Sequence, residues 1–153
     1  YWKTKLWDDG NFACLAGLIS DKLKKKVIFT GSESAPIEKI TSMMGANSIN
    51  LAGQTTLLEL ACIFKKAQLV VTTDSGPMHL ACAVGTPVVA LFGPTDPART
   101  GPYGAGHTII RAGLPCSPCF LKDCLTIQCM KNITPERVFA VVEGRIKKGC
   151  RNY

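Results

Sequence analysis

The sequence predicts an α/β protein with a Rossmann-like open parallel sheet and helices on both faces of that sheet. Two observations support this fold class. Short apolar runs alternate along the chain with helix-like segments, which is the pattern of βα units. The runs are apolar at nearly every position, as expected of parallel strands that are covered on both sides. The chain has 153 residues, 46% of them hydrophobic, and we expect residues 1–153 to form a single domain.

A helix followed by a buried strand is predicted near the start of the chain. Asn11 is a suitable N-cap for the helix. Its apolar residues recur at helical spacing and share one face: Phe12, Leu15, Leu18 and Ile19. The apolar run at residues 27–30 ends at Gly31 and indicates a buried strand.

Two further helices follow, and a weaker strand at residues 49–51 separates them. Ser34 can cap the first of these two helices. Pro36 lies in its first turn, where the missing backbone N–H would have no partner within the helix. The inner face of this helix consists of Ile37, Ile40 and Met44. Thr56 and Glu59 have the spacing of a capping box and predict the start of the next helix.

The second half of the chain carries the clearest strand signals. Residues 69–72 and 88–92 are short apolar runs that predict two buried strands, and residues 107–110 predict a third. Pro77 begins a helix between the first two strands, and Pro135 begins the final helix. The final helix has four apolar residues on its inner face: Val138, Val141, Val142 and Ile146.

The net charge of +7 indicates an affinity for anions. The basic residues gather in two clusters: Lys22, Lys24, Lys25 and Lys26, and then Arg145, Lys147, Lys148 and Arg151. They are either solvated helix ends or a loose attachment to an anionic membrane. Nucleic acid is not predicted as a partner, because such proteins also present exposed aromatic residues near the basic ones. No apolar run reaches the roughly 20 residues of a transmembrane helix.

Eight cysteines are distributed unevenly along the chain. Cys14, Cys62 and Cys82 occur singly in apolar segments and are expected to be buried. Four others form the pattern C-x2-C-x4-C-x4-C: Cys116, Cys119, Cys124 and Cys129. This pattern could hold zinc, but structural zinc sites usually pair two short knuckles across a longer gap. Free thiols and local disulfides are the alternatives, and no metal site is predicted.

Two polar stretches follow predicted strands. Asp74, Ser75 and Gly76 lie between a strand and a helix, and Thr95 and Asp96 follow the next strand. Ligands of open α/β sheets bind beyond the carboxyl ends of the strands, and a helix N-terminus attracts anions. Gly76 would let a phosphate approach the backbone closely, and Asp74 could accept hydrogen bonds from ribose or sugar hydroxyls. The alternative is ordinary turn chemistry.

These stretches also carry a resemblance to a known family. Residues 73–81 and 85–97 look like the C-terminal signature of glycosyltransferase family 9, which includes the ADP-heptose heptosyltransferases. Lys5-x-Trp7, with the Phe-Ala-x-Leu segment at residues 12–15, resembles the family's segment at the start of the donor domain. Residues 53–60 are also similar to the family, so the resemblance covers nearly the whole chain.

The resemblance implies the donor-binding C-terminal half of a GT-B fold. The function would be that of enzymes that transfer heptose from ADP-heptose to the lipopolysaccharide inner core. A non-catalytic module that binds a nucleotide-sugar or a phosphate is the alternative. The general base is expected in an N-terminal domain outside this chain, so no catalytic residue is assigned and the chain alone is expected to be inactive. The implied partners are the nucleotide-sugar donor, the N-terminal domain and a phosphorylated lipid A/core acceptor. The implied location is the cytoplasm, and the periphery of the inner membrane if the basic clusters bind it.

The resemblance also implies the donor and phosphate contacts. Lys5 would pair with the donor pyrophosphate. Backbone at the helix start would line the phosphate pocket: Ser75, Gly76, Pro77, Met78 and His79. Asp74, Thr95 and Asp96 would face the cleft, and Glu33 would contact the ribose. The chain has no Asp-x-Asp motif for a metal. Lys5 and the helix terminus would therefore stabilise the leaving diphosphate, and we expect no metal or other cofactor.

Overall fold

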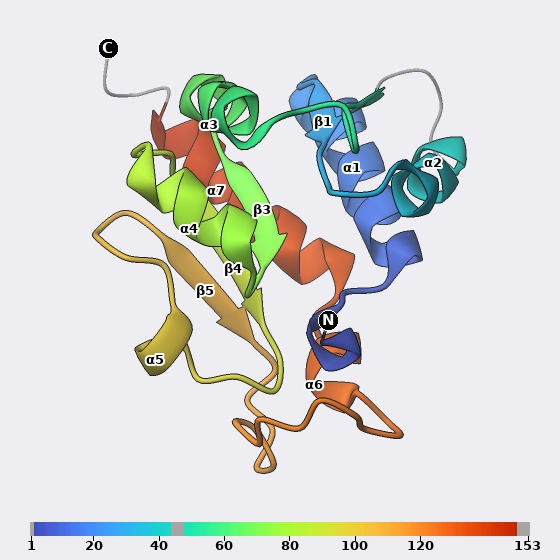
Figure 1. Ribbon diagram of the computed structural model, residues 1–153, viewed down its shortest axis with the longest axis vertical. Coiled ribbons are helices and arrows are strands. Elements are labelled where there is room, and N and C mark those ends of the chain that lie inside the picture. Colours follow the sequence, from blue (N-terminus) through green and yellow to red (C-terminus); the bar gives the residue numbers. More distant parts are fainter. Residues whose placement is uncertain (1, 44–47, 150–153) are drawn as a thin grey trace. The chain divides into compact units, whose positions relative to one another are not determined.

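The computed structural model describes residues 2–43 and 48–149 and confirms the α/β class (Figure 1). The chain divides into two compact units, each built from two separate stretches of sequence. The first unit comprises Tyr1–Trp7 and Ile63–Thr134, and the second comprises Asp8–Cys62 and Pro135–Tyr153. That residues 1–153 act together as one domain stays a prediction. Among the described helices, none is long and apolar enough to cross a lipid bilayer.

The first unit contains a three-stranded parallel sheet in the order β3-β4-β5. The strands are β3 (Val70–Thr73), β4 (Val88–Phe92) and β5 (Thr108–Arg111), each within one residue of the prediction. All five residues of β4 are buried, because this strand is the central one of the sheet and α4 and α6 pack against it. The parallel pairing that the continuous apolar runs predict is thus confirmed.

Short helices complete the first unit. Helix α4 (Gly76–Ala83) packs against β3 and β4, and its Met78 and Ala81 are fully buried. Helix α5 (Pro97–Thr100) follows β4, and α6 (Gln128–Lys131) contacts β4. The start of the chain contributes a 3-10 turn, η1 (Lys3–Lys5). The core around β4 therefore fixes the turn between β3 and α4, which carries the predicted phosphate contacts.

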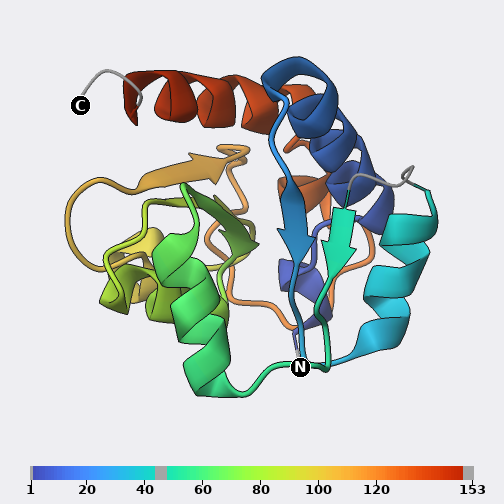
Figure 2. The ribbon, with the colours of Figure 1, turned by 90° about the horizontal axis from the view of Figure 1, so that it is seen from above.

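The second unit has its own two-stranded parallel sheet. Strands β1 (Val27–Phe29) and β2 (Ser48–Asn50) run side by side, and α2 (Ser34–Ser42) lies next to β2 (Figure 2). Helix α1 (Asp9–Leu23) packs against α7 (Pro135–Gly149). The buried residues of α7 are Pro135, Val138, Phe139 and Val142, so Val138 and Val142 lie inside as predicted.

Helix α1 begins earlier than the sequence predicts. Asp8, not Asn11, is its N-cap, because the Asp8 carboxylate accepts a hydrogen bond from Gly10 N at 2.9 Å. The helix buries Ala13, Leu15, Ala16 and Ser20, so only Leu15 of the predicted face is fully buried. Asp and Asn are equally good caps, and propensity alone could not choose between them.

Of the capping residues predicted for two other helices, one set is confirmed and one is wrong. The capping box of α3 (Leu57–Lys66) is confirmed: Glu59 Oε2 accepts from Thr56 N at 2.8 Å, and Thr56 Oγ1 accepts from Glu59 N at 3.3 Å. In α2, Ser34 is the first helical residue rather than the cap, and Glu33 occupies the cap position. Met44, predicted for the inner face of this helix, lies outside the described residues.

The expectation that the isolated cysteines are buried is wrong for two of them. Cys14 in α1 and Cys62 in α3 are exposed, whereas Cys82 in α4 is half-buried. The segments around them are apolar, but Cys14 and Cys62 fall on the solvent side of their helices. The seven described cysteines are all free thiols, and Cys150 lies outside the described residues.

Candidate functional site

The turn between β3 and α4 has a helix N-terminus without a side-chain cap. Ser75 is the N-cap residue, but its hydroxyl makes no capping bond. It donates instead to Thr73 O at 3.1 Å and lies 3.1 Å from Thr72 Oγ1. A Cβ placed on Gly76 would meet no atom within 4 Å, so the space beside this backbone is open. Such a terminus, with the positive end of the helix dipole, is suited to an anion.

The amides available there are fewer than the sequence predicts. Pro77 has no N–H, and Met78 N already donates to Ser75 O at 3.1 Å. The Met78 side chain is fully buried, whereas His79 is exposed on the first turn of α4. Positive charge from outside α4 would therefore strengthen the binding of an anion at this turn.

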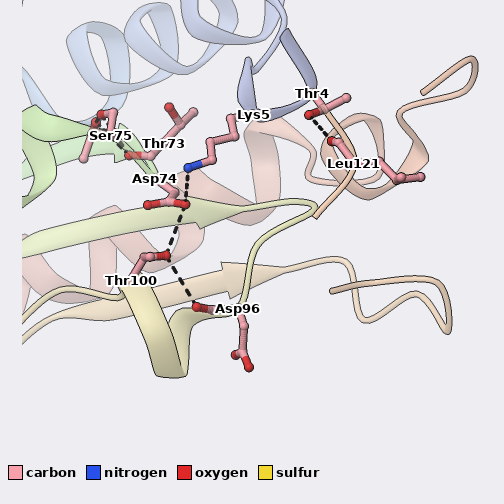
Figure 3. A network of polar contacts seen from close by, with 9 residues as sticks. Thr4, Lys5, Thr73, Asp74, Ser75, Asp96, Thr100 and Leu121 are labelled. Atoms are coloured by element: carbon pink, nitrogen blue, oxygen red, sulfur yellow. Dashed lines mark hydrogen bonds and ion pairs between the residues drawn. The ribbon is translucent and has the colours of Figure 1, made fainter. Parts of the chain in front are cut away.

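Lys5 supplies a positive charge beside this turn. Its Nζ lies 2.7 Å from Asp74 Oδ2, and Figure 3 shows the lysine reaching across to the end of β3. The Asp74 side chain is only 5% exposed, and the Lys5 side chain 23%. A carboxylate this deeply buried requires charged or hydrogen-bonded partners. The ion pair supplies one of them, and it keeps the lysine ammonium at the carboxyl end of β3.

Thr100 is the second partner of Asp74. Its hydroxyl donates to Asp74 Oδ2 at 3.2 Å, and Asp96 O lies 3.4 Å from the same hydroxyl (Figure 3). Asp96 is the N-cap of α5, because its Oδ1 accepts from Ala98 N at 3.0 Å. The carboxylate of Asp96 is thus engaged in holding the short helix that carries Thr100. The described hydrogen bonds connect Asp96 to Asp74 through Thr100 of that helix.

The segment that carries Lys5 is anchored on both sides of it. Thr4 is 1% exposed and its hydroxyl donates to Leu121 O at 2.7 Å. The Trp7 ring is buried and its Nε1 donates to Ile133 O at 2.8 Å. Chain starts usually fray unless tertiary contacts tie them down. These two hydrogen bonds hold Lys5 in place although it lies near the start of the sequence.

A second lysine, Lys122, lies near the same Trp2 ring as Lys5. The Lys5 Nζ lies 4.4 Å from the centre of the Trp2 ring, and the Lys122 Nζ lies 5.8 Å from it. Both ammonium groups are within the range of a cation–π contact. The site therefore contains two lysines and one buried carboxylate, which favours an anionic ligand.

The loop after β4 contains a buried hydroxyl without a partner. Thr95 is 2% exposed, and no described group hydrogen-bonds to its Oγ1. The neighbouring Pro94 O accepts from both Cys119 N at 3.0 Å and Phe120 N at 2.9 Å. Buried polar atoms without partners are uncommon and often mark functional sites. The loop that carries Thr95 is thus held firmly by the segment that follows β5.

The structure brings most of the predicted site residues into one unit. Lys5, Asp74, Ser75 and Gly76 gather at the end of β3, and Thr95 and Asp96 follow β4 in the same unit. Glu33 belongs to the other unit, where it is exposed at the start of α2. Its predicted contact with a ribose stays a prediction.

Four contributors were missed by sequence reasoning: Trp2, Thr4, Thr100 and Lys122. Three of their contacts join residues far apart in the sequence, namely Thr4 with Leu121, Thr100 with Asp74 and Lys122 with Trp2, so no local pattern marks those contacts. The proline and aspartate before Thr100 do predict a short helix start, which would have placed its hydroxyl near Asp96. The four clustered cysteines lie in the same unit, and among the described residues no group of three or more ligand-type side chains is arranged to hold a metal.

Comparisons with known proteins agree with this arrangement. The model of the family described as "Glycosyltransferase family 9 (heptosyltransferase)" matches residues 1–129 of this chain. Lipooligosaccharide heptosyltransferase 2 of Campylobacter jejuni is 30% identical over 154 aligned positions, which cover 96% of this chain and 48% of that protein. The chain thus spans about half the length of this relative.

Solved structures show the same partial match. The ADP-heptose lps heptosyltransferase II of E. coli superimposes with a TM-score of 0.81 at 27% identity, covering 95% of this chain and 43% of that one. A family 9 glycosyl transferase from Veillonella parvula gives a TM-score of 0.83 at 27% identity, with coverage of 95% and 43%. The fold, the site motifs and the family match together show that this chain belongs to glycosyltransferase family 9, the heptosyltransferase family.

Proposed function

We propose that this chain is the donor-binding part of a glycosyltransferase that transfers heptose from ADP-heptose to the inner core of lipopolysaccharide. The observation that supports this most directly is the Lys5–Asp74 pair at 2.7 Å beside the uncapped start of α4. It combines a cation, a helix dipole and an open backbone, which are the features that a diphosphate needs. The solved E. coli relative carries ADP-heptose in its name, which fits this ligand.

The diphosphate would take the place of Asp74 as the partner of Lys5. Both described contacts of Asp74 are made by Oδ2, so Oδ1 is the oxygen available to a hydroxyl of the donor sugar. When the bond between sugar and phosphate breaks, negative charge develops on the leaving diphosphate. The Lys5 ammonium and the start of α4 are fixed before the reaction and would stabilise that charge. In this proposal they fulfil the role that a divalent metal has in other glycosyltransferases.

The general base and the acceptor site belong to the remaining half of the proposed enzyme. The acceptor would be a phosphorylated lipid A/core molecule, and the enzyme would act in the cytoplasm. The two basic clusters, at residues 22–26 and 145–151, would add a loose contact with the anionic surface of the inner membrane. Without its other half, the chain is expected to bind the donor nucleotide but to catalyse no transfer.

Titration calorimetry with ADP, AMP and adenosine tests the donor site directly. We expect the chain to bind ADP more tightly than AMP, and AMP more tightly than adenosine, because the diphosphate contacts Lys5 and the α4 terminus. Equal affinities for the three ligands would contradict a diphosphate site. A transfer assay with the full-length enzyme then tests the reaction, and the isolated chain is its matched inactive control.

A further inference from the structure

Residues 120–126, which we call the exposed loop, have no role in the proposed function. All seven of these residues are exposed, although three of them are large and apolar. Leu125 is fully exposed, Leu121 is 54% exposed and Phe120 is 37% exposed. Single exposed leucines are ordinary on protein surfaces, but several large apolar side chains on one short segment usually mark a surface that binds a partner.

Hydrogen bonds hold the start of the exposed loop in place. Phe120 N donates to Pro94 O at 2.9 Å, and Leu121 O accepts from Thr4 Oγ1 at 2.7 Å. Figure 3 shows the Thr4–Leu121 hydrogen bond, with the Leu121 side chain pointing away from Lys5. The apolar side chains are therefore presented to solvent by an anchored segment, close to the residue that carries the proposed donor contact.

Positive charges accompany these apolar side chains. The Arg99 Cζ lies 5.0 Å from the centre of the Phe120 ring, and the Lys122 Nζ lies 5.8 Å from the centre of the Trp2 ring. Arg99 and Lys122 are both exposed, and Asp123 is the acidic residue of the loop. Apolar groups that enter the acyl region, beside basic groups that meet anionic head groups, are the combination that binds an anionic membrane surface.

A second pair of exposed leucines lacks this combination. Leu57 and Leu58 begin α3 in the other unit and are 72% and 76% exposed. The next residue is Glu59, whose carboxylate accepts a hydrogen bond from Thr56 N at the start of the helix. An anionic surface would repel this carboxylate. Exposure alone does not separate the two places, but charge does, and the α3 leucines are a matched control.

We infer that the exposed loop inserts its apolar side chains into the surface of an anionic lipid bilayer. The choice of a membrane rests on the proposed function, because the acceptor proposed there is a lipid that must reach the donor site. Figure 1 shows the segment between β5 and α6 beyond the carboxyl end of β5, and the Thr4–Leu121 hydrogen bond ties this segment to the turn that carries Lys5. Insertion of the loop would thus bring the proposed donor site to the membrane surface.

Quenching of tryptophan fluorescence by brominated lipid tests the inference. Leu125→Trp places a reporter on the loop at a fully exposed position, and Leu58→Trp places the matched reporter on α3. The vesicles contain phosphatidylglycerol and phosphatidylcholine brominated on the acyl chains. At low salt we expect stronger quenching of Leu125→Trp than of the unmodified chain, and no increase for Leu58→Trp.

The lipid and salt dependence should follow from the charges. Quenching should be absent with vesicles of phosphatidylcholine alone. It should also disappear near 1 M salt, where the Debye length is about 3 Å, because a few apolar side chains do not hold a protein on a membrane without electrostatic attraction.

Serine variants measure how much the loop contributes to binding. Leu125→Ser should weaken co-sedimentation with the anionic vesicles about tenfold, the factor expected when most of a buried leucine side chain is lost. Leu58→Ser should bind like the unmodified chain. Circular dichroism establishes that each variant is folded. Equal quenching of the two tryptophan variants, or equal vesicle affinity of the two serine variants, would overturn the inference.

Two other occupants of the loop would be recognised by different results. If Leu125→Trp were quenched in this chain but not in the full-length enzyme, the other half of the enzyme would cover the loop. If Leu125→Ser abolished a dimer seen by gel filtration, a second copy would cover it. Either result would overturn membrane insertion.

Calorimetry with ADP keeps this inference separate from the proposed function. Leu125→Ser should bind ADP as tightly as the unmodified chain. A chain that binds ADP but shows no quenching would refute only the insertion of the loop. A chain that is quenched but does not bind ADP would refute only the donor site.

Discussion

The ammonium of Lys5 lies 2.7 Å from the carboxylate of Asp74, in a pair that joins the start of the chain to the end of β3. Asp74 is nearly buried, whereas Lys5 keeps about a quarter of its side chain in solvent. A diphosphate at the start of α4 would therefore compete with Asp74 for a lysine that is already in position. The two residues should have opposite effects on the binding of a free nucleotide.

Replacing Lys5 with methionine should weaken ADP binding and leave adenosine binding unchanged. The expected loss is about 1.5–3 kcal/mol, the range for a hydrogen bond to a charged group. Calorimetry with both ligands measures it. Lys3→Met is the control, since Lys3 is exposed in the same 3-10 turn and should have little effect. If Lys5→Met reduced the affinity for ADP and adenosine equally, Lys5 would not contact the diphosphate.

Asp74→Asn should raise the affinity for free ADP several-fold, because the variant no longer competes for the Lys5 ammonium. The same change should lower the free energy of unfolding by about 1–2 kcal/mol, less than for a fully buried pair, since Lys5 is partly exposed. Calorimetry and urea denaturation measure the two effects. Asp123→Asn, at an exposed position, is the matched control. Weaker ADP binding by Asp74→Asn would rule out the competition between Asp74 and the diphosphate.

Gly101→Ala should disturb the helix that holds Thr100 against Asp74. An added Cβ would run into Pro97 O, which also accepts the Gly101 N–H at 2.8 Å. Overpacking of this kind usually costs about 1–3 kcal/mol. Urea denaturation should show this loss. Gly17→Ala in α1 meets nothing within 4 Å and should be neutral or stabilising, as alanine is in helices. Equal stability of Gly101→Ala and the unmodified chain would contradict the tight turn after α5.

The sequence predicted the strands of the first unit and the capping box of α3 well, because these signals lie within a few neighbouring residues. The predicted start of α1 was wrong because Asp8 and Asn11 are equally favourable N-cap residues by propensity. Cys14 and Cys62 were wrongly predicted to be buried, because an apolar segment does not reveal which side of its helix faces solvent. Within the site, the family motifs identified Lys5 and Asp74, but only the fold shows that they pair.

The capping box of α3 makes a pH-dependent contribution to stability. The pKa of Glu59 lies below its ordinary value of 4.5, because the Thr56 backbone N–H and hydroxyl stabilise the carboxylate. This stabilisation is fully present above about pH 4.5, the value in the unfolded chain, and is lost as the pH falls through the lower folded value. Glu59→Gln should therefore be less stable than the unmodified chain at neutral pH but not in acid. Urea denaturation at several pH values, with the exposed Glu136→Gln as control, checks this difference.

The two basic clusters, at residues 22–26 and 145–151, should bind anionic vesicles at low salt but not neutral ones; Arg151 lies outside the described residues. Each basic residue near an anionic surface contributes about 1 kcal/mol. Binding should disappear near 1 M salt, where the Debye length is about 3 Å. Co-sedimentation measures it, and replacing Lys24 and Lys26 by glutamine should reduce it. The same change at Lys65 and Lys66, exposed on α3, is the matched control. Binding that ignores salt, or no binding at low salt, would mean that these residues are only solvated helix ends.

The interleaving of the two compact units has a consequence for how the protein is made. Each unit combines an early stretch of the chain with a late one: residues 1–7 with 63–134, and residues 8–62 with 135–153. The ribosome releases Lys5 long before Asp74, and α1 long before α7, so neither unit can close until its later stretch has been made. Domains ordinarily fold as units in the order in which they emerge. Here the apolar faces of α1 and of the Trp7 segment stay uncovered until α7 and Ile133 have been made, so the closing of both units follows the synthesis of these later stretches.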